Sequence, residues 1–171
     1  MRYKITFLDY WHLSSGLSSG AKADSTVLKD KDGLPYFSGK TIKGLTREMA
    51  ELTMDEKFIN ICFGNEGNSA GACYFSDVIL DDSTRKIIVD KSLQSNLYTE
   101  LASTKIDENG IAKTGSLREI EVVIPITLYG TIENIPKEYQ TSMINALKSI
   151  KRAGLNRNRG LGRCKIEIVG E

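Results

Sequence analysis

The order of the predicted strands and helices constrains the fold of this chain more than any other feature. A half-buried strand alternates apolar and polar residues, whereas an amphipathic helix repeats its apolar residues every three or four positions. These periods predict the order strand, helix, strand, strand, helix, strand, with a short helix, a small hairpin and an excursion inserted. We expect strands at 2–8, 73–80, 86–90, 119–132 and 163–169, helices at 40–53, at 55–62 and between Pro136 and Gly154, and the excursion at 91–118.

This order is that of the ferredoxin-like or RRM-like fold, βαββαβ. It is an α+β fold in which the helices lie on one face of an antiparallel sheet. A length of 171 residues fits one domain, 1–171. The Ser- and Gly-rich stretch 13–24 is read as a long loop, and a loop of this length inside a compact domain is usually functional. The function itself has to come from particular residues, because a fold alone does not specify it.

Charge is balanced over the whole chain but not along it. The sequence has 23 Lys and Arg against 22 Asp and Glu, which gives no whole-chain argument for nucleic-acid binding. Residues 1–50 hold eight basic and five acidic side chains, residues 137–171 hold eight and three, and the middle is acidic. If the two ends meet in space, they form a basic patch on a neutral protein.

Histidine and cysteine limit the possible chemistry. The only histidine, His12, excludes a pair of catalytic histidines within one chain and the two-His zinc motifs. Cys62, Cys73 and Cys164 show no C-x-x-C spacing, so we expect buried free thiols rather than a zinc site completed by His12. Free thiols suit a reducing cytoplasm. No stretch reaches the roughly 20 apolar residues of a membrane span, and we expect no membrane partner.

The stretch GLNRNRGLGR at 154–163 is the most informative motif. Glycine lets the backbone approach a ligand closely, and arginine offers a planar fork of donors that matches phosphate oxygens. The stretch therefore predicts a clamp for the phosphates of RNA or DNA. The structural alternative is a helix stop followed by a solvated arginine turn. The candidate contacts are Arg157, Arg159, Gly160, Gly162 and Arg163.

The start of the helix predicted at 40–53 resembles a nucleotide-binding P-loop. The match fails because Gly33 lies one residue too early. What remains is a glycine with cations at a helix N-terminus, where free amides and the helix dipole favour an anion. The alternative is an ordinary helix, capped by Ser38 or Thr41, with exposed lysines. The candidate contacts here are Lys40, Thr41 and Lys43.

Asp24, at the end of the Ser- and Gly-rich loop, is a candidate metal ligand. An ordinary aspartate has a pKa near 3.9 and is a poor base at neutral pH. A catalytic role for Asp24 therefore calls for a divalent metal that activates water or orients a phosphate. The structural alternative is an aspartate that is solvated or that caps a local turn or helix. His12 has the better pKa for acid–base work, although a lone histidine beside Trp11 also suits packing.

Four ordered motifs resemble the RAMP superfamily of CRISPR-associated proteins, and most of all the guide-RNA-binding backbone subunits of type III interference complexes. The first, within 12–47, contains GLPYFSGKTIKGLTR, similar to the family's L-P-x-x-P-G-S-S-L-K-G-x-x-R with Ser38 at the second proline. The second is Phe63-Gly64 followed by Phe75-Ser76-Asp77. The third joins 104–107 to 115–119, and the fourth is 157–163.

The resemblance implies a RAMP domain with an inserted thumb hairpin at about 91–118 and a C-terminal glycine-rich loop. It implies that this loop and the helix of Lys43 and Arg47 grip the phosphates of a guide RNA, with His12 among the RNA contacts. The thumb would kink the guide–target duplex. Asp24 falls where catalytic members carry an aspartate that supports cleavage of target RNA with Mg²⁺ or another divalent cation.

The partners that the resemblance implies are crRNA, a complementary target RNA, other RAMP subunits and a large effector subunit. Some relatives lack the aspartate and are purely structural, so a non-catalytic RNA-binding subunit is the alternative to a metal-dependent endoribonuclease. A third alternative is a guide-processing endoribonuclease that uses His12 without a metal. That alternative ranks last, because a single histidine leaves no second imidazole to protonate the leaving group.

Overall fold

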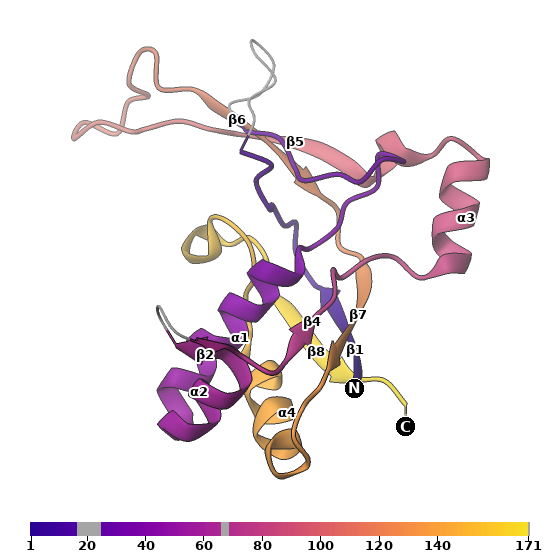
Figure 1. Cartoon of the computed structure of the whole chain (residues 1–171). Helices are drawn as coiled ribbons and strands as arrows, with labels where there is room; N and C mark the ends of the chain where they lie inside the picture. Colours follow the sequence, from indigo (N-terminus) through magenta and orange to yellow (C-terminus); the bar gives the residue numbers. More distant parts are fainter. Residues whose placement is uncertain (17–24, 66–68, 171) are drawn as a thin grey trace.

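Helices cover one face of a four-stranded antiparallel sheet in the computed structural model, which describes residues 1–16, 25–65 and 69–170 (Figure 1). The strand order is β4–β7–β1–β8, and β1 pairs with both β7 and β8. This order and the element sequence confirm the predicted ferredoxin-like class. The strands are β1 (Arg2–Phe7), β4 (Tyr74–Phe75), β7 (Thr127–Glu133) and β8 (Cys164–Ile168).

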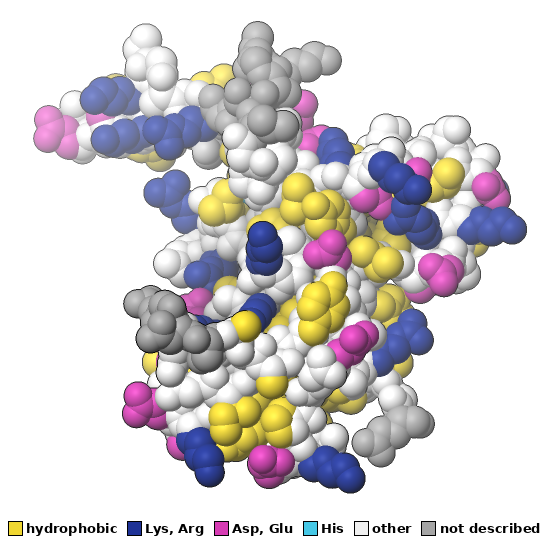
Figure 2. All heavy atoms as spheres, in the orientation of Figure 1, with side chains coloured by type: hydrophobic (Ala, Val, Ile, Leu, Met, Phe, Trp, Pro, Cys, Tyr) yellow, Lys and Arg dark blue, Asp and Glu magenta, His cyan; other side chains and the backbone are white. Residues whose placement is uncertain are grey.

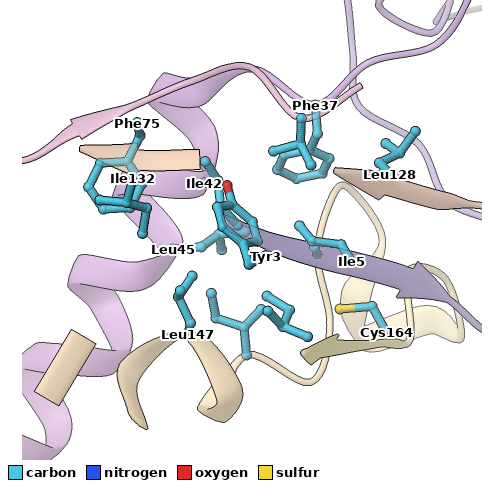
Figure 3. Packing of buried hydrophobic residues seen from close by; sticks show 14 of the residues in the cluster. Tyr3, Ile5, Phe37, Ile42, Leu45, Phe75, Leu128, Ile132, Leu147 and Cys164 are labelled. Carbon is cyan, nitrogen blue, oxygen red and sulfur yellow. The ribbon is translucent and has the colours of Figure 1, made fainter. Parts of the chain in front are cut away.

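The core lies between this sheet and the helices α1 (Gly39–Thr53) and α4 (Gln140–Ser149). The alternation of β1 buries Tyr3, Ile5 and Phe7, as predicted. Figure 3 shows Tyr3 and Ile5 with Ile42 and Leu45 of α1 and Leu147 of α4. The spacing of Ile42, Leu45, Met49 and Leu52 predicts one apolar face of α1. Leu52 departs from this prediction, since it is 74% exposed.

A second short helix, α2 (Glu56–Phe63), follows α1 as predicted. The Asp55 side chain caps it by accepting a hydrogen bond from the backbone amide of Phe58. Gly64, with a φ of +88°, ends it. A small ladder of β2 (Gly64–Asn65) and β3 (Ser69–Ala70) follows.

The strand predicted at 86–90 is wrong, since these residues belong to the helix α3 (Asp82–Asp90). The β-branched run at 87–89 favoured a strand, but Asp81 caps a helix by accepting from the amide of Thr84. Ile88 alone is buried, and Arg85 pairs with Asp30 and Asp32. Capping and ion pairing therefore outweigh strand propensity here.

The strand predicted at 119–132 is two strands that belong to different sheets. Pro125, a residue type that favours a bend or an edge position in a strand, lies in the break. The first of the two strands is the return arm of a protruding hairpin, which we call the hairpin (residues 98–123; Figure 1). The sequence Glu108-Asn109-Gly110 predicts a turn, and a turn lies there, in the outer part of the hairpin. The hairpin strands are β5 (Tyr98–Ser103) and β6 (Arg118–Val123), preceded by a short 3-10 turn η1 (Gln94–Leu97).

The hairpin is tied to the segments on both sides of the Ser- and Gly-rich loop. Trp11 forms an isolated bridge with Val123, and Ser25 forms one with Ile120. The carboxylate of Glu121 accepts a hydrogen bond from the amide of Val27 at 2.9 Å and pairs with Lys29 at 2.7 Å. The hairpin base and residues 25–29 are thus one connected unit. Among the described residues, no helix is long and apolar enough to cross a membrane.

Candidate nucleic-acid interface

The glycine-rich loop (residues 154–163) is anchored at both roots by backbone contacts. The amide of Leu155 donates to the carbonyl of His12, and that of Gly162 donates to the carbonyl of Tyr10, both at 2.8 Å. A Cβ on Gly154 would lie 2.4 Å from the His12 oxygen, and one on Gly162 would lie 2.0 Å from the Ala153 oxygen. The absence of a side chain at Gly162 therefore serves the packing of the loop. The predicted helix stop at Gly154 is also wrong, because α4 ends at Ser149.

The tip of the loop is open. It forms a short 3-10 turn, η3 (Arg157–Arg159), entered through Asn156 in the left-handed region. Gly160 has a φ of +92°, and a Cβ at this position would meet no described atom within 4 Å. The tip thus presents backbone and arginine side chains to the solvent.

The three arginines of the loop have different surroundings. Arg157 pairs with Glu48 of α1 at 3.4 Å, and Arg163 pairs with Asp9 at 3.2 Å. Arg159 is exposed and, within the described part of the chain, pairs with no carboxylate. Of the three arginines in the predicted clamp, Arg157 and Arg163 are thus paired with carboxylates and Arg159 is not.

Arg159 lines a cleft of about 720 Å³ between the loop and the hairpin, which we call the basic cleft. Lys105 and Arg118 of the hairpin also line it, and no described lining residue carries a carboxylate. Figure 2 shows several Lys and Arg side chains along the protruding hairpin in the upper part of the view. The remaining lining residues are hydroxyl-bearing, apolar or glycine: Ser103, Thr104, Gly115, Ser116 and Leu117.

Lys105 and Arg118 are the site residues that sequence reasoning missed. Both lie in the third motif, on opposite sides of the turn at 108–110. The available signal was the pairing of 104–107 with 115–119 across that turn. Their convergence with Arg159 depends on where the hairpin docks, which the local sequence does not encode.

The start of α1 is an ordinary capped helix rather than an open anion site. The amide of Gly39 donates to the Asp77 carboxylate at 2.7 Å, and the amide of Thr41 donates to the Ser38 hydroxyl at 3.3 Å. The Thr41 hydroxyl also shares a hydrogen bond with Ser38. The chain's own side chains therefore occupy donors that an anion would need.

The cations of α1 are not gathered into the basic cleft. Arg47 pairs with Glu51 at 2.7 Å and donates to the Gly64 carbonyl at 3.2 Å. Lys40 is exposed and Lys43 is half-buried, and neither lines the cleft. The cations at the start of α1 therefore do not add to the basic cleft, although Arg157 joins the loop to Glu48 farther along α1.

His12 is a buried structural residue, 1% exposed, and this corrects its assignment as an RNA contact. Its Nδ1–H donates to the Glu121 carbonyl at 2.5 Å, so its Nε2 accepts from the Ser25 hydroxyl at 3.0 Å in the neutral ring. Both nitrogens are engaged within the protein. His12 joins the segment after the Ser- and Gly-rich loop to the hairpin.

Asp24 lies outside the described residues. Its neighbour Ser25 is held by His12, by the Ser14 hydroxyl at 3.1 Å and by the bridge to Ile120. Within residues 1–16, 25–65 and 69–170, no group of three or more His, Cys, Asp or Glu could hold a metal ion.

The three cysteines are buried free thiols, as predicted. Burial raises the pKa of Cys62 to about 12, with the nearby Cys73 adding to the effect, and raises that of Cys164 to about 11. At neutral pH these thiols are protonated and act as small apolar side chains.

Comparisons with known proteins agree with this architecture. The chain has a TM-score of 0.77 with a chain in the cryo-EM structure of the type III-B Cmr-beta bound to cognate target RNA, at 13% identity over 97% of this chain and 95% of that chain. It has the same TM-score with a chain of the type III-B Cmr-beta in its apo state, at 14% identity over 99% and 97%. None of the curated proteins matches the chain.

The likeness to the solved structures concerns the fold, whereas the family rests on sequence. The model of the RAMP superfamily matches residues 4–165, which include both the hairpin and the glycine-rich loop. The resemblance inferred from the four motifs is thereby confirmed: the chain belongs to the RAMP superfamily.

Proposed function

We propose that this chain is a guide-RNA-binding backbone subunit of a type III CRISPR effector complex. The basic cleft carries the proposal, because three cations and several hydroxyl groups converge there from two elements with no carboxylate among them. Membership of the RAMP superfamily supports it, as does the likeness to chains in two structures of the type III-B Cmr-beta, one of which has cognate target RNA bound. The proposed partners are crRNA, complementary target RNA, other RAMP subunits and a large effector subunit, in the cytoplasm.

The chemistry of the basic cleft suits a ribose–phosphate backbone. Arg118 and Arg159 offer forked donors to phosphate oxygens, and Lys105 adds a point charge. The hydroxyls of Ser103, Thr104 and Ser116 suit phosphate oxygens and the ribose 2′-OH. Binding of this kind reads the backbone and leaves sequence to base pairing with the guide.

A decisive experiment is to tag the chain in its host, purify it gently and sequence the RNA that accompanies it. Discrete RNAs made of CRISPR repeat and spacer establish guide binding. A random RNA mixture, or none, contradicts it. A parallel preparation in which Lys105, Arg118 and Arg159 are changed to Gln should lose the RNA while keeping its fold by circular dichroism.

We further propose that Asp24 supports cleavage of target RNA with Mg²⁺ or another divalent cation. A bound cation would supply an activated water or a polarised phosphate. The chain's own contribution is placement, because Ser25, the residue after Asp24, is held against the hairpin by His12 and Ile120. Asp24→Ala should abolish cutting in Mg²⁺ while target binding is kept. Cutting at unchanged positions by this variant rules the role out.

A non-catalytic subunit is the second candidate. The described lining of the basic cleft contains no carboxylate, so the cleft can hold RNA without contributing a metal ligand. Intact target RNA after incubation of the assembled complex with Mg²⁺ would favour this candidate. Metal-independent guide processing by His12 gains no support, because both ring nitrogens bond within the protein.

A further inference from the structure

Two carboxylates from separate elements hold two arginines of the glycine-rich loop. Glu48 of α1 lies 3.4 Å from Arg157, and their side chains are 51% and 39% exposed. Asp9, just after β1, makes a two-point contact with Arg163, with Nε–Oδ2 at 3.2 Å and Nη2–Oδ1 at 3.4 Å. Pairs this exposed are individually weak and exchange readily with other anions.

The surroundings of Arg157 already form an anion-attracting hollow. Arg157 and Glu48 line a space of about 400 Å³ together with Lys151 and Arg152. A phosphate that entered this hollow would meet three cations and one carboxylate. Among the described residues that line the hollow, Glu48 alone carries a carboxylate that competes with the phosphate for the Arg157 guanidinium.

The cations around the loop therefore fall into two classes. Arg159 and its neighbours in the basic cleft pair with no carboxylate among the described residues, so any phosphate gains their full attraction. A phosphate that binds Arg157 or Arg163 must first displace a carboxylate. Its net gain in binding free energy is therefore reduced by the free energy of the ion pair that is lost. A strand gains from the second class only when its phosphates lie on these arginines.

We propose that Glu48 and Asp9 are built-in counter-ions that occupy Arg157 and Arg163 in the RNA-free chain and are displaced by phosphates of the bound strand. This inference rests on the proposed RNA-binding function. It assigns the carboxylates a role in setting the affinity for RNA. They lower the affinity for a strand whose phosphates reach Arg157 and Arg163, because that strand must displace them.

The test is a double-mutant cycle on the full chain, with a fluorescently labelled single-stranded RNA as the probe. Glu48→Gln should tighten binding about two- to fivefold, the effect expected of one exposed ion pair. In an Arg157→Gln background the same change should have no such effect, because the group it releases is absent. Asp9→Asn with Arg163→Gln provides an independent second cycle.

Glu133→Gln is the matched control, since it makes the same change in net charge. Glu133 is exposed at the end of β7, beyond the residues that pair with β1, whereas the loop leads into the opposite end of the sheet. Tightening that is equal for Glu48→Gln and Glu133→Gln, or that persists without Arg157, overturns the inference while RNA binding stands. Absence of RNA binding by the unmodified chain in its complex instead overturns the proposed function.

Discussion

The glycine-rich loop and the start of α1 carry similar sequence signals but have different structures. Each combines glycine with cations beside a helix, and each predicts a phosphate site. At α1, Asp77 and Ser38 accept the hydrogen bonds of the Gly39 and Thr41 amides. In the loop, Gly160 stays open and Arg159 faces the basic cleft. The difference shows that a phosphate motif is decided by what packs beside it.

The largest expected effect is on stability, and it distinguishes the packed Gly162 from the open Gly160. Gly162→Ala should cost about 3 kcal/mol or more of folding free energy, because its Cβ would lie 2.0 Å from the Ala153 oxygen at a φ of +71°. Gly160→Ala meets no atom and should cost only about 1 kcal/mol for its φ of +92°. Urea denaturation measures both. Equal losses would mean that the loop is not anchored as described.

The next prediction compares the cations of the two regions. Changing Lys105, Arg118 and Arg159 to Gln together should lower RNA affinity at least about tenfold and flatten the salt dependence of log K by about two units. Lys40→Gln with Lys43→Gln should have a smaller effect, because neither residue lines the cleft. Binding titrations from low to high salt measure this. A larger loss from the α1 pair would reverse the comparison.

A smaller effect is expected when the start of α1 loses its acceptor. Asp77→Ala leaves the Gly39 amide without the bond now measured at 2.7 Å and should cost about 1 kcal/mol of stability. RNA affinity should stay unchanged, since Asp77 is not among the described residues that line the basic cleft. Thermal melts and RNA titrations of the same preparation separate the two quantities. A drop in RNA affinity without a loss of stability would show that the start of α1 contributes to RNA binding.

The smallest expected effect is on the stability of α3, where another carboxylate, that of Asp81, caps a helix. Hydrogen bonds from Ser83 and then Thr84 lower the pKa of Asp81 from its ordinary 3.8 to about 2. A carboxyl group with a lowered pKa in the folded state stabilises the fold above its unfolded pKa. This contribution is lost as the pH falls from about 4 towards 2.

Melting temperatures between pH 5 and pH 2 check the sign. Asp81→Asn should be less stable than the unmodified chain at pH 5, and the gap should narrow as the pH approaches 2. A gap that does not change with pH would show that the carboxylate charge contributes nothing at the start of α3.

Sequence periodicity predicted the sheet and its helices because burial decides them. The alternating apolar residues of β1 face the core, and so do Met143 and Leu147 of α4. The period of the apolar residues therefore identified both the strand and the helix. Periodicity failed at 86–90, where Asp81 and Arg85 decide the structure through contacts that apolar spacing does not register. It also joined β6 to β7, because both strands share one apolar run across Pro125.

The site was only partly predictable for the same reason. Arg159 and the open Gly160 follow from the motif, but Asp9 and Glu48 come from segments far away in sequence. His12 was assigned as an RNA contact through the family resemblance, whereas in the structure it is buried and bonds to Ser25 and Glu121. Sequence reasoning found the groups that can bind an anion and missed which of them are already engaged.

The position of Trp11 gives the chain a natural optical reporter. It is the only tryptophan, it is fully buried, and its indole stacks on Phe7 with ring centroids 4.4 Å apart. Its backbone exchanges hydrogen bonds with Val123 at the hairpin base. Its emission should therefore be blue-shifted in the native chain. Release of the hairpin from the four-stranded sheet and its helices should change that emission, while the helical circular dichroism is retained. Hairpin docking can therefore be followed without any label.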